Sequence, residues 1–156
     1  MGLLNYTTKI DPDKTAQEIA RCLSMHGASA VLTEYDPENS YVSAISFQIK
    51  LGEQKMGFRL PCDWKPVLTI ITKGKKKPWG EQRLRHWESQ WRDQAVRTAW
   101  RIVKDWVEAQ MALVETQMVT TAEVFLPYTV MKDGRTLAQH AQSDPSFLLG
   151  DGNKDQ

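Results

Sequence analysis

The sequence predicts an α+β fold, in which a small antiparallel sheet packs against a long, tryptophan-rich C-terminal helix. Short alternating or β-branched segments fill the first 61 residues and are separated by turn residues. Between Arg83 and Gln117 no glycine or proline occurs, and apolar residues recur every three or four positions. With 156 residues, 41% of them hydrophobic and 25% charged, the chain predicts a single α+β domain over 1–149 and a disordered tail over 150–156.

The first part of the chain predicts the element order β-α-β-β-β. The helix has clear ends, since Asp11 is a good N-cap, Pro12 suits the first helical position and Gly27 suits the C-terminal cap. The strands around it are expected at 5–10, 28–36, 41–51 and 55–61. Such an order places one helix across a face of an antiparallel sheet.

The segment after Cys62 is ambiguous. Residues 67–72 are rich in β-branched side chains, as a strand would be. A helix over 66–73 is the preferred interpretation, because Asp63 lies where an N-cap is needed. The basic stretch 73–82 that follows contains two glycines and a proline, and it predicts a solvated loop.

The helix predicted over 83–117 is long for a domain of this size, at roughly 50 Å. A break near Ser89–Asp93, or dimerisation through its exposed end, would accommodate that length. A short capping helix follows, because Thr120 and Glu123 match a capping box. A turn at 132–135 and one or two helical turns at 135–142 complete the chain.

Charge is segregated along the chain. Residues 73–104 carry ten basic and three acidic side chains, a net charge of +7, whereas 1–72 carry −1 and 105–156 carry −5. A basic block of this kind favours nucleic acid as the partner. The overall charge of +1 conceals it.

Individual residues of the basic block have distinct expected roles. The lysines anchor phosphates, Trp79 stacks on a base, and the helix continues the charge. The expected nucleic-acid-binding residues are Lys73, Lys75, Lys76, Lys77, Trp79, Arg83, Arg85, Arg92, Arg97, Arg101 and Lys104. The alternative is that pairs such as Asp93–Arg97 and Arg101–Asp105 only solubilise the helix.

A protein partner is the competing interpretation. Leu84, Trp87 and Trp91 lie beside arginines, which is the composition of an interface hot spot. This alternative describes an inhibitor or adaptor of another protein. The acidic 105–156 segment also allows a homo-oligomer, in which it meets the basic block of a second copy. Sequestration of a small nucleotide is a lesser variant.

Catalytic and metal motifs are weak, so we expect a non-catalytic protein without a cofactor. Cys22 and His26 are four residues apart on the expected helix and Cys62 is a third candidate ligand, but three scattered residues are a poor zinc signal. His86 and His140 lie in other elements, without a nucleophile motif nearby. The Gly-Lys in "TKGKKK" lacks the remainder of a phosphate-binding loop.

The sequence favours a cytoplasmic location away from membranes. No stretch of 18 apolar residues is present, and the N-terminus lacks the basic and long apolar regions of a signal peptide. Two cysteines are too few for a disulfide scaffold, which suits a reducing compartment.

Two stretches resemble an uncharacterised family of small bacterial and phage-borne proteins. They are "AWRIVKDWVEAQMALVE", within residues 94–137, and "FRLP" at 58–61, and the similarity extends to residues 6–36. The lysine-rich loop matches least. The resemblance implies one compact domain encoded on a phage or other mobile element, and it implies no activity, substrate or catalytic residue.

Overall fold

The computed structural model describes residues 2–149 of the chain and confirms an α+β fold with a three-stranded antiparallel sheet and one long helix. The tail expected at 150–156 lies outside the described residues. The elements are α1 (Pro12–Met25), β1 (Ala28–Tyr35), β2 (Val42–Leu51), β3 (Gln54–Arg59), α2 (Trp64–Thr72), α3 (Glu81–Glu115), α4 (Thr121–Phe125), η1 (Leu126–Tyr128, a 3-10 helix), α5 (Leu137–Ser143) and α6 (Ser146–Leu149).

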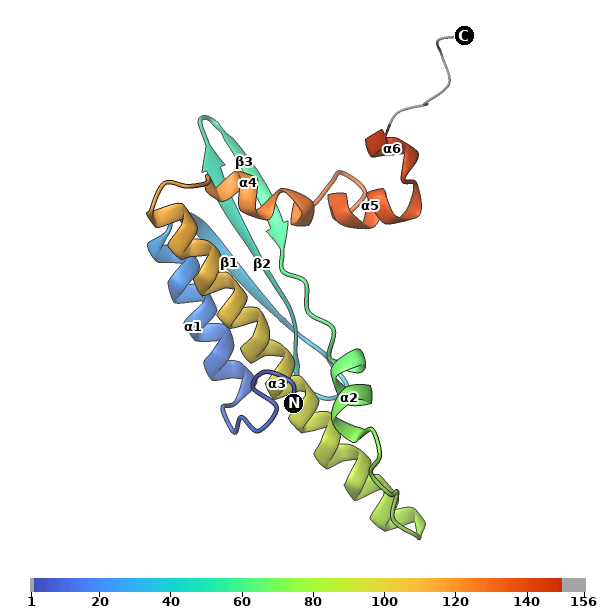
Figure 1. The fold of residues 1–156 in the computed structure, drawn as a ribbon. Coiled ribbons are helices and arrows are strands. Elements are labelled where there is room, and N and C mark those ends of the chain that lie inside the picture. Colours follow the sequence, from blue (N-terminus) through green and yellow to red (C-terminus); the bar gives the residue numbers. More distant parts are fainter. Residues whose placement is uncertain (1, 150–156) are drawn as a thin grey trace.

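The sheet has the order β1-β2-β3, with β2 in the centre. Phe47 on β2 lies opposite Val31 on β1 and Phe58 on β3, which sets the register. Helices α1 and α3 lie side by side over one face of the sheet and run in the same direction (Figure 1). The sheet thus separates a helix-covered face from a second face, where Leu32 is 58% exposed.

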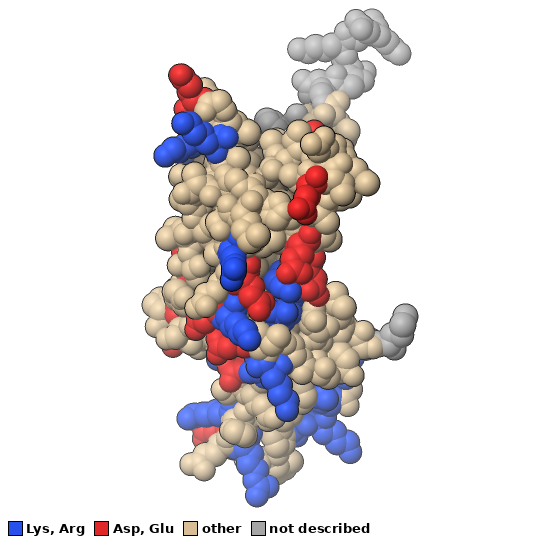
Figure 2. Space-filling view, turned by 90° about the vertical axis from the view of Figure 1, so that its left-hand side faces the viewer, with Lys and Arg blue, Asp and Glu red and all other residues tan. Residues whose placement is uncertain are grey.

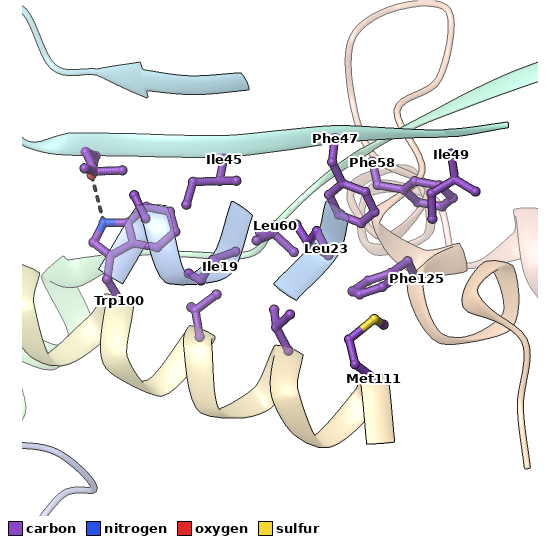
Figure 3. Packing of buried hydrophobic residues seen from close by; sticks show 14 of the residues in the cluster. Ile19, Leu23, Ile45, Phe47, Ile49, Phe58, Leu60, Trp100, Met111 and Phe125 are labelled. Carbon is purple, nitrogen blue, oxygen red and sulfur yellow. Dashed lines mark hydrogen bonds between the residues drawn. The ribbon is translucent and has the colours of Figure 1, made fainter. Parts of the chain in front are cut away.

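One hydrophobic core joins the two layers, because α1, α3 and the sheet each contribute one apolar face to it (Figure 3). The aromatic rings of Phe47, Phe58 and Phe125 pack on one another at one end of the core. The buried members are Ala16, Ile19, Leu23, Val42, Ile45, Phe47, Ile49, Phe58, Leu60, Val96, Trp100, Val103, Val107, Met111 and Phe125.

The strand predicted at 5–10 is wrong. Residues 4–7 form a turn, and this N-terminal segment lies along α3 instead of joining the sheet. Its carbonyl groups are satisfied by side chains, since Gln94 Nε2 donates to Tyr6 O and Thr8 O at 2.9 Å each. The alternating pattern was therefore misleading, because helix side chains supply the hydrogen bonds that a neighbouring strand would provide. The sheet accordingly follows α1, in the order α-β-β-β.

The predicted helix starts are confirmed where a capping residue was identified. The Asp11 side chain accepts from Asp13 N, and the Asp63 side chain accepts from Lys65 N, so 64–72 is a helix and not a strand. Thr120 and Glu123 form the expected capping box. A second box at Thr136 and Gln139 begins α5. Local capping chemistry thus determines most helix boundaries.

Helix α3 continues without a break through Ser89–Asp93. Its 35 residues extend about 52 Å, whereas the ten residues of β2 extend about 33 Å. The helix therefore projects beyond the sheet at its N-terminal end, where α2 packs along it (Figure 1). We call this end, residues 64–92, the projecting arm.

Two contacts determine where α3 leaves the sheet. Trp100, 1% exposed, donates from Nε1 to Val42 O at 2.8 Å (Figure 3). Tyr41 donates its hydroxyl to Asp93 Oδ1. Burial and this hydrogen bond raise the pKa of Tyr41 to about 12, so the phenol stays a donor at neutral pH. The sheet thus meets α3 from Asp93 onward, and residues 81–92 lie beyond it.

We expect Trp100→Ala to lower the free energy of unfolding by about 3–5 kcal/mol, because it leaves a large cavity and an unpaired Val42 carbonyl. Chemical denaturation measures this change. The matched control is Trp79→Ala, at a position 92% exposed, which should change stability by less than about 0.5 kcal/mol. Equal losses in the two variants would contradict the role of Trp100.

Candidate nucleic-acid interface

The projecting arm carries eight basic and two acidic side chains, a net charge of +6. Figure 2 shows Lys and Arg side chains gathered at the lower end of the molecule, whereas acidic and basic groups alternate around its middle. Figure 1 identifies that end as α2, the 73–80 loop and the start of α3. The fold thus concentrates the basic charge on one projecting element.

The 73–80 loop connects α2 to α3 and presents Lys73, Lys75, Lys76 and Lys77, all exposed. Two glycines shape the loop, since Gly74 has a φ of 79° and Gly80 a φ of 95°. Side chains with a Cβ rarely adopt such backbone angles. The loop conformation that displays the lysines therefore depends on glycine at its two ends.

The cations of the arm are mostly unpaired. Among residues 2–149, Arg85 is the one basic side chain of the arm in an ion pair, which it forms with Glu81 one turn earlier. Arg83 is exposed, and Arg92 is half-buried. Trp79 is 92% exposed, so its indole ring faces solvent beside the lysines. An aromatic ring and several uncompensated cations thus share one exposed surface.

Leu84, Trp87 and Trp91, expected at an exposed partner interface, are each half-buried. Trp87 and Trp91 face α2, where they line a hollow of about 490 Å³ together with Trp64 and Leu68. Helix α2 thus covers part of the apolar stripe that the sequence suggested for a partner. These tryptophans hold the two helices of the arm together.

Arg97, Arg101 and Lys104 were expected to extend the row of phosphate-binding side chains, but each is held by a partner on α3, on α1 or in the N-terminal segment. Arg97 donates to Gln94 Oε1 at 2.5 Å, and Arg101 pairs with Glu18 on α1. Lys104 pairs with Glu108 at 2.9 Å. The side chains of Arg101 and Lys104 are 13% and 16% exposed. We therefore leave these three out of the candidate interface.

The Asp93–Arg97 and Arg101–Asp105 pairs expected within the helix are absent from the described part of the chain. Asp93 accepts from Tyr41, and Asp105 accepts from Asn5 Nδ2 at 2.7 Å. The charged groups in this part of α3 therefore attach the helix to β2, α1 and the N-terminal segment.

A cavity of about 320 Å³ lies at the base of the arm, between the N-terminal segment, the end of α2 and α3. Lys75 Nζ lies 4.3 Å from the centroid of the Trp91 ring, at cation–π distance. Sequence analysis missed this cavity, because Tyr6 and Trp91 are far apart in the chain. The eight residues that line it are Tyr6, Thr7, Ile71, Lys75, Gln90, Trp91, Gln94 and Arg97.

The candidate metal ligands do not form a site. Within residues 2–149 no group of three His, Cys, Asp or Glu side chains is placed to hold a metal ion. His26 Nδ1 donates to Cys22 O at 2.7 Å, as part of the end of α1. Burial raises the pKa of the Cys62 thiol to about 12, and burial also raises that of Cys22. Neither thiol is a ready thiolate at neutral pH.

A cluster of Asp133, Arg135 and His140 near α5 uses both nitrogens of its histidine. His140 Nε2 donates to Asp133 at 3.0 Å, and Nδ1 accepts from Arg135 Nη2 at 3.2 Å. No ring nitrogen is left to accept a proton from Ser143 Oγ, which itself donates to His140 O. The cluster therefore stabilises the 132–143 segment and lacks the arrangement of a catalytic triad.

Comparison with known proteins does not assign this chain to a family. No family model, curated protein or solved structure matches this chain. Over residues 2–149, no helix has both the length and the apolar character that crossing a membrane requires.

We expect Arg101→Met to lower the free energy of unfolding by roughly 1–3 kcal/mol, because it leaves Glu18 without its partner. Equilibrium unfolding in urea measures this loss. Arg85→Met is the matched control, since its pair with Glu81 is exposed and should contribute less than about 0.5 kcal/mol. Unchanged stability of Arg101→Met would show that this pairing is not structural.

The His140 and Arg135 hydrogen bonds lower the pKa of the Asp133 carboxyl well below its ordinary value. A carboxylate with a lowered pKa stabilises the folded state above about pH 4, and the contribution is lost as the pH falls. We therefore expect Asp133→Asn to lower Tm near neutral pH, with the gap to the parent narrowing below about pH 4. Glu53→Gln, in the β2–β3 turn, is the control, and a gap independent of pH would contradict the assignment.

Proposed function

We propose that this protein is a non-catalytic nucleic-acid-binding protein and that the projecting arm is its binding surface. The observation that supports the proposal is the net charge of +6 on an element that stands clear of the sheet. The binding residues we assign are Lys73, Lys75, Lys76, Lys77, Trp79, Arg83, Arg85 and Arg92.

The physical basis is release of counterions from phosphates. Each phosphate neutralised by a lysine or arginine adds affinity that weakens as salt rises. The start of α3 adds to this attraction, because Gly80 provides no side-chain cap and the first N–H groups of a helix favour anions.

Trp79 supplies a contact of a different kind. Its ring is almost fully exposed on the basic loop, and exposure of a large aromatic side chain is unfavourable without a partner. Stacking on a base contributes on the order of 1–3 kcal/mol in single-stranded complexes. We assign Trp79 to stacking at the tip of the arm.

A protein partner is the second candidate, favoured by the exposure of both Trp79 and Arg83 on a projecting element. Tryptophan and arginine are typical of interface hot spots. In this proposal the protein acts as an inhibitor or adaptor of a host enzyme or defence complex. The phage or mobile-element origin and a cytoplasmic location belong to both proposals and rest on the sequence alone.

We expect Lys75→Ala/Lys76→Ala/Lys77→Ala to weaken binding to labelled oligonucleotides at least about tenfold at low salt and to reduce the salt slope by roughly 2. Fluorescence anisotropy at several salt concentrations measures both, on protein whose mass is established by light scattering. The mass also reports whether the protein forms a homo-oligomer.

The matched control is Lys50→Ala/Lys55→Ala/Lys132→Ala, which removes the same charge from exposed lysines outside the arm. Equal effects of the two triple variants would mean that net charge alone drives binding. No binding of any oligonucleotide by the parent protein at about 50 mM salt would reject the nucleic-acid proposal and favour a protein partner.

A further inference from the structure

The cavity at the base of the arm has the chemistry of a site for one unpaired base. We infer that it receives a base of a single-stranded nucleic acid, with Trp91 as the stacking surface. This inference rests on the proposed function and assigns the strand form that the arm takes.

The cavity has the size and polarity that such a base needs. Its volume of about 320 Å³ lies within the range of small-ligand sites. Tyr6, Ile71 and Trp91 give it apolar and aromatic walls, and none of the described residues that line it is an Asp or a Glu. Lys75 and Arg97 both line it, but Arg97 already donates to Gln94 Oε1 and Thr8 O, so Lys75 is the cation that can meet a phosphate.

One face of the Trp91 ring can be freed for stacking if the Lys75 side chain moves away. In the structure the Lys75 ammonium group covers this face, at 4.3 Å from the ring centroid. Lys75 is an exposed residue of the loop with a long side chain, so its ammonium group can move off the ring. A base that enters the cavity displaces the ammonium group from the ring. The displaced ammonium group then contacts the phosphate of the same nucleotide. Lys75 thus covers the Trp91 ring in the free protein and binds the phosphate in the complex.

Gln90 supplies a polar group for the base edge. Its side chain is exposed at the cavity, and its amide offers both donors and an acceptor. Gln94, also in the lining, is already occupied, since its Nε2 donates to Tyr6 O and Thr8 O. Hydrogen bonding to a base therefore falls to Gln90.

The position of the cavity explains the preference for an unpaired strand. In a duplex both faces of each base are covered by its neighbours, so a ring inside a cavity is reached only by a base that is unpaired. Lys75 belongs to both the cavity and the exposed basic loop. The lysines of the 73–80 loop that are assigned to phosphates are thus continuous with the stacking surface on Trp91.

The test compares four probes on the parent protein by fluorescence anisotropy and competition. They are single-stranded oligothymidine of about twelve nucleotides, an abasic oligomer of the same length, a duplex of that length and thymidine monophosphate. A fifth probe, an RNA oligomer of the same length, shows whether the unpaired strand is DNA or RNA. The expected result is that oligothymidine binds roughly 5- to 100-fold more tightly than the abasic oligomer.

Variants then locate the stacking. Trp91→Ala should abolish the preference for oligothymidine over the abasic oligomer, and Trp91→Phe should retain most of it. Trp87→Ala is the matched control, because it removes an indole from the same helix one turn earlier and does not line this cavity. Quenching of 2-aminopurine in a bound oligomer gives a direct stacking signal in the parent protein, which should be lost in Trp91→Ala and kept in Trp87→Ala.

Several outcomes would overturn the inference while leaving the proposed function intact. Equal, salt-dependent affinity for the oligothymidine and abasic probes would mean that the arm binds the phosphates and makes no contact with the bases. Tighter binding of the duplex rejects the single-stranded assignment. Thymidine monophosphate binding as tightly as the oligomer would, by contrast, count against the proposed function as well, because it indicates a site for free nucleotides. Because the probe comparison uses the parent chain, it holds even if Trp91→Ala fails to fold.

Discussion

The position of α3 on the sheet depends on the hydrogen bond from the Trp100 indole to the carbonyl of Val42, at the first residue of β2. The large buried ring and its one donor, together with the hydrogen bond from Tyr41 to Asp93, hold the helix against sliding along its axis. Because Trp100 is fixed at the start of β2, the later residues of α3 cover the sheet. The first twelve residues of α3, 81–92, extend about 18 Å beyond Asp93. The arm, its loop and its cavity all follow from this one register.

The same helix contains two kinds of basic residue, and its exit from the sheet separates them, apart from Arg85, which pairs with the exposed Glu81 beyond the sheet. Arg101 and Lys104 lie over α1 and the sheet, where acidic partners compensate their charge. Arg83 and Arg92 lie past the sheet and have no acidic partner among the described residues. A basic residue on a continuous helix is thus structural or available for a ligand according to what lies beside it, which charge and spacing alone do not reveal.

The sequence predicted those parts of the fold whose interacting residues are close together in the chain. Asp63 and the Thr120–Glu123 box act within a few residues, so those helices were predictable from the sequence. The N-terminal segment was wrongly predicted as a strand, because its hydrogen-bond partners lie on Gln94, more than 80 residues away. The basic loop was predictable as a charge pattern, but the cavity under it depends on Tyr6, Ile71 and Trp91 meeting in space.

The uneven burial along α3 also divides the helix into two parts of different local stability. Its buried residues begin at Ala95, and α2, which packs on the earlier turns, has none. Opening of the arm thus breaks few buried contacts, whereas opening of the 95–111 stretch disrupts the core, so the backbone amides of the arm exchange with solvent through small local fluctuations. A ligand held between α2 and α3 would add contacts to the part of the molecule that has the fewest buried residues. Binding would therefore reduce the local fluctuations of the arm.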